Sequence, residues 1–241
     1  MDRVLEYEIP SEYDGANITT VLKRHFKIST NLIKDLKKYK EGIQVNGEHR
    51  RVVDFVAKGD ILKITIRDTA SENIVPTDIP LDIVYEDEDV LVINKPPNMP
   101  THPSMGNYEN SLANGVMYYY KSKGEERVFR AVNRLDKDTS GLMAVAKNSY
   151  IHARLGEEIQ KKELKRKYMC IVCGDVEHDG TVDAPIRRAD GSVINRIVAP
   201  DGQRAVTHYR VIKRYREYTL LEMELETGRT HQIRVHMAYI G

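Results

Sequence analysis

The chain has 241 residues, of which 41% are hydrophobic and 30% charged, and its formal net charge is +1 at pH 7. This composition is that of an ordinary globular protein and excludes a chain that is basic throughout. The longest apolar runs, such as VLVIN at 90–94, are too short to cross a bilayer, and the start MDRVLEYEIP lacks the apolar segment of a signal peptide. We therefore expect a cytoplasmic protein without a membrane partner.

Residues 14–67 predict a small N-terminal unit that begins with two helices. In ITTVLKRHF (18–26), apolar residues recur near helical spacing. The stretch ISTNLIKDLKKYKEG (28–42) predicts a second helix, capped by Ser29 or Thr30 and stopped by the glycine at its end.

A small sheet and a basic face complete this unit. IQVNGEHRRV (43–52) predicts a hairpin, because Asn-Gly suits a tight primed turn, and AKGDILKITI (57–66) adds a strand. Residues 21–51 hold nine lysines and arginines against three carboxylates. A solvated helix face and a phosphate-binding face both explain this bias. The candidate RNA-binding residues on the helices are Lys23, Arg24, Lys34, Lys37 and Lys38.

The same order of elements resembles the αL-type RNA-binding module named after ribosomal protein S-four. The resemblance rests on Leu36 to Lys38, Gly42, Val45 to Gly47 and Lys58 to Asp60. It implies an S-four-like domain that contacts structured RNA by shape and phosphates, with little reading of bases.

Residues 68–80, DTASENIVPTDIP, are polar, contain two prolines and predict a linker. From residue 81 to 241, strands and helices are mixed, which predicts an α+β domain with helices packed against a sheet. Strands are expected over 81–95 (two, joined at an acidic turn), 165–174, 205–215 and 218–226, and helices over 110–121, 149–160 and 229–240. In the last helix, Ile233, Met237 and Ile240 form the expected core stripe.

The two cysteines, Cys170 and Cys173, have C-x-x-C spacing, but no second pair or nearby His completes a metal site. In a strand, residues three apart point to opposite faces. We expect no metal, and two small hydrophobes at these positions.

The stretch RLDKDTSGL (134–142) places Asp136 between the cations Arg134 and Lys137, ahead of turn-forming residues and the apolar run LMAVA. Asp136 is therefore expected on a loop that enters a buried strand. Adjacent positive charge favours its ionised form, which can attack an electron-poor carbon or stabilise positive charge. A structural ion pair is the other explanation of this triplet.

Four motifs occur together in this order: NKPPNMPTHPS, VNRLDKDTSGLMAVAKN, KRKY and ETGRTHQIRVHM. Together they resemble the RluA-type pseudouridine synthases, which isomerise uridine in ribosomal or transfer RNA. The resemblance runs from about Ile83 to the last residue. It implies the pseudouridine synthase fold, a mixed and mainly antiparallel sheet with flanking helices.

The resemblance also implies roles for single residues. Asp136 matches the catalytic aspartate, Tyr168 the tyrosine that stacks on the uracil, and Arg234 the basic partner of the aspartate. Arg134 matches an arginine that helps to open the RNA. The reaction adds no group from outside, so no cofactor is expected. A nucleophilic and a glycal-like route both remain open for Asp136.

Further cations lie in residues 184–205, a basic insertion. It is a candidate RNA-binding loop or an ordinary surface loop, and Arg187 and Arg188 are the RNA-binding candidates there.

Two positions depart from the family pattern: Asn133 replaces a His and Asn98 a Gly. We expect Asn133 to keep a hydrogen-bonding role and Asn98 to adopt positive φ. The chain stops at MAYIG, where relatives continue, and is expected to be truncated.

The sequence thus predicts a monomeric RNA pseudouridine synthase that acts on structured RNA. Large-subunit ribosomal RNA is favoured, with transfer RNA open. A non-catalytic RNA-binding or ribosome-assembly factor on the same scaffold is the first alternative. A carboxylate hydrolase is the second, for which Asp138 is the only acid close to Asp136 in sequence.

Overall fold

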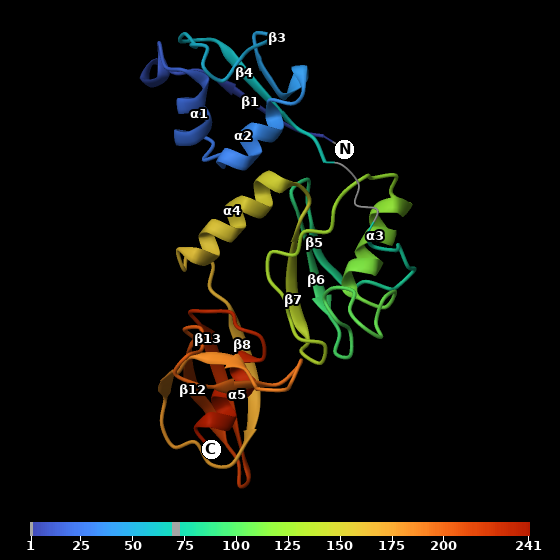
Figure 1. The fold of residues 1–241 in the computed structure, drawn as a ribbon, viewed down its shortest axis with the longest axis vertical. Coiled ribbons are helices and arrows are strands. Elements are labelled where there is room, and N and C mark those ends of the chain that lie inside the picture. The colour runs from blue at the N-terminus through green and yellow to red at the C-terminus, as the bar shows by residue number, and fades with distance from the viewer. Residues whose placement is uncertain (1, 69–72) are drawn as a thin grey trace. The chain divides into compact units, whose positions relative to one another are not determined.

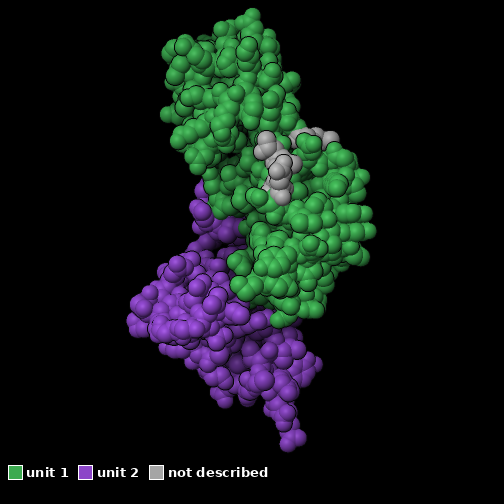
Figure 2. Space-filling model, turned by 45° about the vertical axis from the view of Figure 1, so that its right-hand side comes forward, with its two compact units in different colours: residues 1–157 green, residues 158–241 purple. Residues whose placement is uncertain are grey.

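The structure, a computed structural model, describes residues 2–68 and 73–241. The chain forms two compact units, Met1–Glu157 and Glu158–Gly241 (Figure 2). All strand pairs in the described parts of the chain are antiparallel. The predicted α+β class with antiparallel sheet is therefore confirmed. Over residues 2–68 and 73–241, no helix combines the length and the apolar character needed to span a membrane.

The first unit opens with a four-stranded sheet of order β1–β4–β2–β3, covered by two helices (Figure 1). Its elements are β1 Arg3–Glu8, α1 Ile18–Arg24, α2 Thr30–Leu36, β2 Ile43–Val45, β3 Glu48–His49 and β4 Ile61–Ile66, with 3-10 turns Ser11–Tyr13 and Lys40–Gly42. Asn46 and Gly47 take φ values of 52° and 83°, as the predicted primed turn requires. β1 was not predicted, and with it this sheet begins before residue 14.

The second helix is capped as predicted but is shorter. The Ser29 side chain accepts a hydrogen bond from the backbone N–H of Leu32, and the helix ends at Leu36 instead of reaching Gly42. The chain then turns back so closely that a Cβ at position 42 would overlap the carbonyl oxygen of Leu36. Glycine at this position therefore permits the turn that carries the chain from the helix into β2.

Part of the predicted linker packs on the domain that follows it. Residues 69–72 lie outside the described residues. The side-chain amide of Asn114, a buried residue, donates to the carbonyl oxygen of Val75 at 2.8 Å, and Thr77 N–H donates to the carbonyl oxygen of Asn114 at 3.2 Å. The segment around residues 75–77 is thus held by its backbone.

A three-stranded sheet of order β5–β6–β7 follows in the first unit (Figure 1). The elements are β5 Ile83–Glu86, β6 Val90–Lys95, α3 Leu112–Ser122, β7 Gly141–Ala146 and α4 Ser149–Gln160. Burial raises the pKa of Glu86, but hydrogen bonds from Lys147, Tyr119 and Lys123 outweigh it and hold the pKa at about 2. This carboxylate joins α3 to the end of β5.

The second unit contains a sheet of order β8–β13–β12–β9, a separate hairpin and one helix. The elements are β8 Lys167–Cys173, β9 Gly180–Asp183, β10 Ile186–Arg188, β11 Arg196–Val198, β12 Val206–Arg214, β13 Tyr218–Leu225 and α5 Gln232–Tyr239. The strands expected over 165–174, 205–215 and 218–226 are confirmed. The basic insertion at 184–205 is not an irregular loop, because β10 and β11 pair from Ile186↔Val198 to Arg188↔Arg196.

The core stripe predicted for the last helix is only partly correct, because Ile233 and Met237 are half-buried and not fully buried. The buried residues of α5 are Gln232 and His236, whereas Ile240 is exposed. Gln232 donates to the carbonyl oxygen of Val206 at 3.0 Å, and His236 lies 2.9 Å from the Thr207 hydroxyl. Hydrogen bonds therefore satisfy two polar side chains one turn apart, and these take the inward face.

Candidate functional site

Asp136 lies on the loop that enters β7, as predicted. Its side chain is half-buried, while the flanking Arg134 and Lys137 are exposed. The loop closes as a turn in which Thr139 N–H donates to the carbonyl oxygen of Asp136 at 3.1 Å. The carboxylate is thus neither sealed in the core nor carried on a long free segment.

The segment after β6 fixes the backbone on both sides of Asp136. The hydroxyl of Thr101 donates to the carbonyl oxygen of Leu135 at 2.8 Å and accepts from its N–H at 3.4 Å. On the other side, Met99 N–H donates to the carbonyl oxygen of Lys137 at 3.1 Å. Both neighbours of Asp136 are held, which is the pre-organisation that a catalytic group requires.

Lys95, at the end of β6, is fully buried and adds to the contacts of Thr101 and Met99. Together these contacts form a clamp on the backbone at Leu135 and Lys137. Its ammonium donates at 2.8–3.1 Å to the carbonyl oxygens of Pro96, Met99 and Lys137. Burial lowers the pKa of Lys95, and attraction to the carboxylates of Asp138 and Asp136 opposes this. Neither Lys95 nor Thr101 was predicted as a site residue, although both lie in the NKPPNMPTHPS motif.

The two departures from the family pattern behave as expected. Asn133 donates from its side chain to the carbonyl oxygen of Leu142 at 3.4 Å and accepts from the N–H of Ala144 at 3.0 Å. It therefore pins the loop against β7. Asn98 has a φ of 60°, so the turn that the family builds with glycine is retained.

The side chain of Arg134 is exposed to solvent. Desolvation and the nearby charge of Arg134 both lower the pKa of His102. The His102 ring packs edge-on against Phe129, with 5.2 Å between ring centroids. Among the residues that the structure describes, Arg134 has no ion-pair partner within 4.0 Å.

The other catalytic candidates belong to the second unit. Tyr168 is half-buried on β8, in register with Met223 of β13. Arg234 is exposed on α5. The first unit therefore carries Asp136, and the second carries Tyr168 and Arg234.

The basic candidates of the N-terminal helices are all exposed: Lys23, Arg24, Lys34, Lys37 and Lys38. Two of them have partners, since Lys38 pairs with Asp35 at 2.7 Å and Lys23 donates to the Thr30 hydroxyl at 2.6 Å. Arg24, Lys34 and Lys37 make no ion pair within residues 2–68 and 73–241. This surface therefore keeps unneutralised positive charge.

Arg187 and Arg188 lie on the hairpin strand β10 and differ in their surroundings. Arg187 is paired with Asp190 at 2.7 Å and with Asp201 at 2.9 Å. Arg188 is exposed and stands opposite Arg196 of β11.

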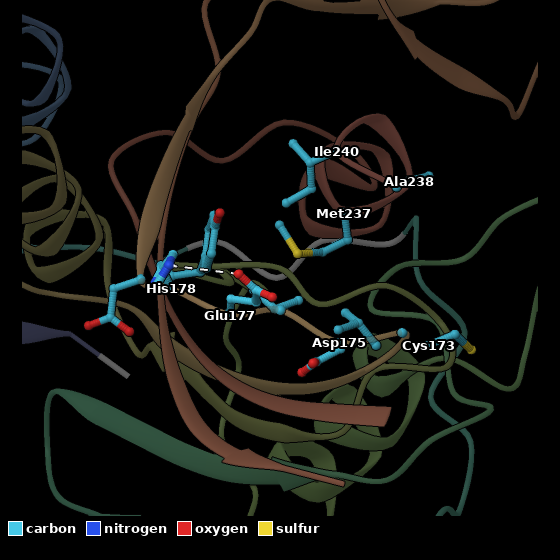
Figure 3. Close-up of a pocket in the computed structure, with 13 residues that line it drawn as sticks. Cys173, Asp175, Glu177, His178, Met237, Ala238 and Ile240 are labelled. Atoms are coloured by element: carbon cyan, nitrogen blue, oxygen red, sulfur yellow. Dashed lines mark ion pairs between the residues drawn. The ribbon is translucent and has the colours of Figure 1, made fainter. Parts of the chain in front are cut away.

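A cavity of about 550 Å³ in the second unit contains none of the predicted site residues (Figure 3). Its lining includes the carboxylates of Asp175, Glu177 and Asp179, together with Met237 and Ile240 of the α5 region. Such a lining repels phosphate, so this cavity does not suit an RNA backbone.

The two cysteines are placed as predicted, on opposite faces of β8. Cys170 is half-buried and Cys173 exposed, and burial raises the pKa of the Cys170 thiol. Within the described ranges, no group of three or more His, Cys, Asp or Glu side chains is arranged to hold a metal ion.

Known proteins resemble this chain in both sequence and fold. The human RNA pseudouridylate synthase domain containing 1 matches 68% of this chain and 67% of its own at 21% identity, with a TM-score of 0.56. The human protein named RNA pseudouridylate synthase domain containing 4 is 28% identical. The match covers 65% of this chain and 63% of that chain, with a TM-score of 0.51. These likenesses define a pseudouridine synthase fold.

Sequence relatives make the assignment narrower. Residues 89–239 match the family described as RNA pseudouridylate synthase. The uncharacterized RNA pseudouridine synthase YjbO of Bacillus subtilis (strain 168) is 44% identical over 216 residues, which are 89% of this chain and 76% of that protein. Ribosomal large subunit pseudouridine synthase D of Escherichia coli (strain K12) is 48% identical over 165 residues, which are 68% of this chain and 51% of that protein.

The chain therefore belongs to the RNA pseudouridylate synthase family. It is an isomerase whose substrate is RNA.

Proposed function

We propose that this enzyme converts a uridine of large-subunit ribosomal RNA to pseudouridine, with Asp136 as the catalytic carboxylate. The observation that carries the assignment is the clamp on both sides of Asp136, made by Thr101, Met99 and Lys95. It holds a half-buried anion at the rim of a sheet without sealing it from a substrate.

The proposed chemistry needs only the chain's own side chains. The bond between the ribose C1′ and N1 of the uracil breaks, the base turns while it is held, and C5 bonds to C1′. The proton on C5 leaves and N1 gains one, so atoms and electrons balance without a cofactor. The carboxylate of Asp136 serves either by adding to the ribose or by removing its C2′ proton.

Two side chains of the second unit complete the proposed site. Tyr168 is proposed to stack on the uracil, and Arg234 is proposed as the basic residue that acts with the catalytic aspartate, the roles that their family motifs imply. Both assignments carry over from the family motifs K-R-K-Y and H-Q-I-R.

RNA binding is proposed to use two parts of the first unit, the basic face of the N-terminal region and Arg134. The N-terminal region 14–67 acts as an S-four-like module through exposed cations of α1, of α2 and of the residues directly after α2: Lys23, Arg24, Lys34, Lys37 and Lys38. Arg134 fills the space that the flipped base leaves in the RNA. A target base in paired RNA costs a few kcal/mol to extrude, and phosphate contacts offset that cost.

The choice of RNA rests on relatives named ribosomal large subunit pseudouridine synthase D. We also propose that the enzyme acts in the cytoplasm and as a monomer. The purified protein should therefore form pseudouridine in a transcript of bacterial large-subunit ribosomal RNA. Carbodiimide modification and primer extension would locate the product. A protein that modifies only transfer RNA transcripts under the same conditions would refute the proposed substrate.

Replacing Thr101 with Val should slow pseudouridine formation by about 10–100-fold, because a small displacement of a catalytic group has effects of this size. The change keeps the side-chain volume but removes the hydroxyl that bonds to both backbone groups of Leu135. Thr101→Ser keeps the hydroxyl and should remain near wild type. The measurement is single-turnover kinetics on the RNA transcript, and equal rates for the Val and Ser variants would contradict the clamp.

A further inference from the structure

A second cavity of the second unit, of about 320 Å³, has a basic lining. It lies between the hairpin β10–β11, the loop after β11 and the turn before α5. Four arginines line it against a single carboxylate, that of Asp201: Arg187, Arg188, Arg196 and Arg229. The positive charge of this cavity contrasts with the acidic lining of the cavity in Figure 3.

One of the four arginines is neutralised within the protein. Arg187 donates from Nε to Asp201 at 2.9 Å and from both Nη nitrogens to Asp190 at 2.7 and 3.1 Å. It also donates to the carbonyl oxygen of Arg188 at 2.8 Å. Arg187 therefore braces the hairpin and leaves the other arginines without a balancing carboxylate.

Arg188 and Arg196 are directly opposite each other on the paired strands. Like charges in this position destabilise a hairpin. Arg196 donates only to the carbonyl oxygens of Ile194 and Asn195, and neither arginine forms an ion pair in the part of the chain that the structure describes. The hairpin thus carries a repulsive pair that an anion in the adjoining cavity would relieve.

Arg229 approaches the same cavity from the turn before α5 and is held in place. Its backbone N–H donates to the side-chain oxygen of Gln232 at 2.9 Å, and Gln232 is only 3% exposed. Its Nε donates to the carbonyl oxygen of Arg204 at 3.0 Å. Its two Nη nitrogens meet no protein acceptor within the described ranges, so their N–H groups remain for a ligand.

The cavity lining is closely packed at Gly202. A Cβ at Gly202 would lie 2.7 Å from the backbone N and C atoms of Ile186. Gly202 therefore lets the loop after β11 lie directly against β10, which fixes the shape of the cavity. A fixed cavity with unneutralised guanidinium groups from two separate elements is suited to one tetrahedral anion.

We propose that this cavity binds a backbone phosphate of the RNA through Arg188, Arg196 and Arg229, an inference that rests on the proposed function for the identity of the ligand. The guanidinium groups donate to the non-bridging oxygens of the phosphodiester. The contact carries no sequence information and anchors the second unit on the RNA.

The test measures RNA affinity as a function of salt. All variants are made in an Asp136→Asn background, so that no turnover occurs, and the probe is the labelled large-subunit transcript between 50 and 200 mM KCl. Arg188→Gln and Arg229→Gln should each weaken binding about 10-fold and reduce the slope of log affinity against log salt by about one. Because one phosphate is shared, the double variant should reduce the slope no further.

Arg216→Gln is the matched control, since it removes the same charge from an exposed position between β12 and β13, outside the cavity. It should leave the slope at the background value. Arg188→Gln should also raise Tm by about 1–3 °C, because it removes the repulsion with Arg196. A residue with a merely structural role would lower Tm instead.

Two outcomes would overturn the phosphate site: slopes for Arg188→Gln and Arg229→Gln that equal the control, or a lower Tm for Arg188→Gln together with unchanged RNA affinity. Loss of all binding to the transcript in the parent protein would instead contradict the proposed function. The two failures are therefore distinguishable.

Discussion

Asp136→Asn is expected to reduce pseudouridine formation by at least about 10³-fold, because an amide neither attacks the ribose nor removes its proton. The amide has nearly the same volume, and the clamp on Leu135 and Lys137 involves only backbone groups at these positions. The fold and the affinity for RNA should therefore persist. Single-turnover conversion of the transcript and a separate binding titration measure the two effects.

The control for this change is Asp138→Asn. Asp138 is an exposed carboxylate two residues away, and it also attracts Lys95. Asp138→Asn should keep nearly full activity, because three carbonyl oxygens hold the Lys95 ammonium and Asp138 makes no hydrogen bond to it. A rate for Asp136→Asn close to that of Asp138→Asn would exclude Asp136 as the catalytic group.

Asp68→Ala should lower the free energy of unfolding by about 3–5 kcal/mol, the range for breaking one side of a buried ion pair. Arg130 donates from its two Nη nitrogens to the two oxygens of Asp68 at 2.6 and 2.5 Å. The side chain of Asp68 is only 2% exposed, and that of Arg130 is 17% exposed. Loss of the carboxylate leaves a guanidinium charge with little access to water.

Urea denaturation followed by fluorescence or circular dichroism measures this effect. The double variant Asp68→Ala, Arg130→Met should recover part of the loss, since no charge then remains unpaired. Glu41→Ala, which breaks the exposed pair with Arg67, serves as the control and should change stability by less than about 1 kcal/mol. Equal losses for Asp68→Ala and Glu41→Ala would contradict the role of the buried pair.

Turns and strands that depend on neighbouring residues in the sequence could be predicted. The Asn46-Gly47 hairpin formed because both residues tolerate positive φ. The Asp136 loop could likewise be placed, because turn-forming residues precede the buried strand β7. The first strand, Arg3–Glu8, was missed since its six residues alternate between half-buried and exposed and carry no strong apolar signal.

Features that depend on long-range contacts could not be predicted in the same way. Lys95 meets the carbonyl oxygen of Lys137, 42 residues along the chain, and Thr101 meets Leu135. Apolar spacing missed the two fully buried positions of α5, because Gln232 and His236 are buried through hydrogen bonds to distant groups. Periodicity detects apolar burial and has no means of detecting a satisfied polar core.

The basic residues likewise could be located from the sequence, but their ion pairs could not. Counting charges identified the N-terminal helices and the insertion at 184–205, but it could not separate Arg187 from Arg188. The first is paired with two carboxylates and the second faces another arginine. That difference arises from strand register and is visible only in the folded chain.

The most direct test of Asp136 as the catalytic carboxylate is a pseudouridine map of large-subunit ribosomal RNA from cells that lack this gene. The cells would be complemented with either the wild-type gene or the Asp136→Asn variant, at matched protein levels. We predict that one or more pseudouridines disappear on deletion, return with the wild type and stay absent with the variant. Return of the modification with Asp136→Asn would contradict the proposed mechanism.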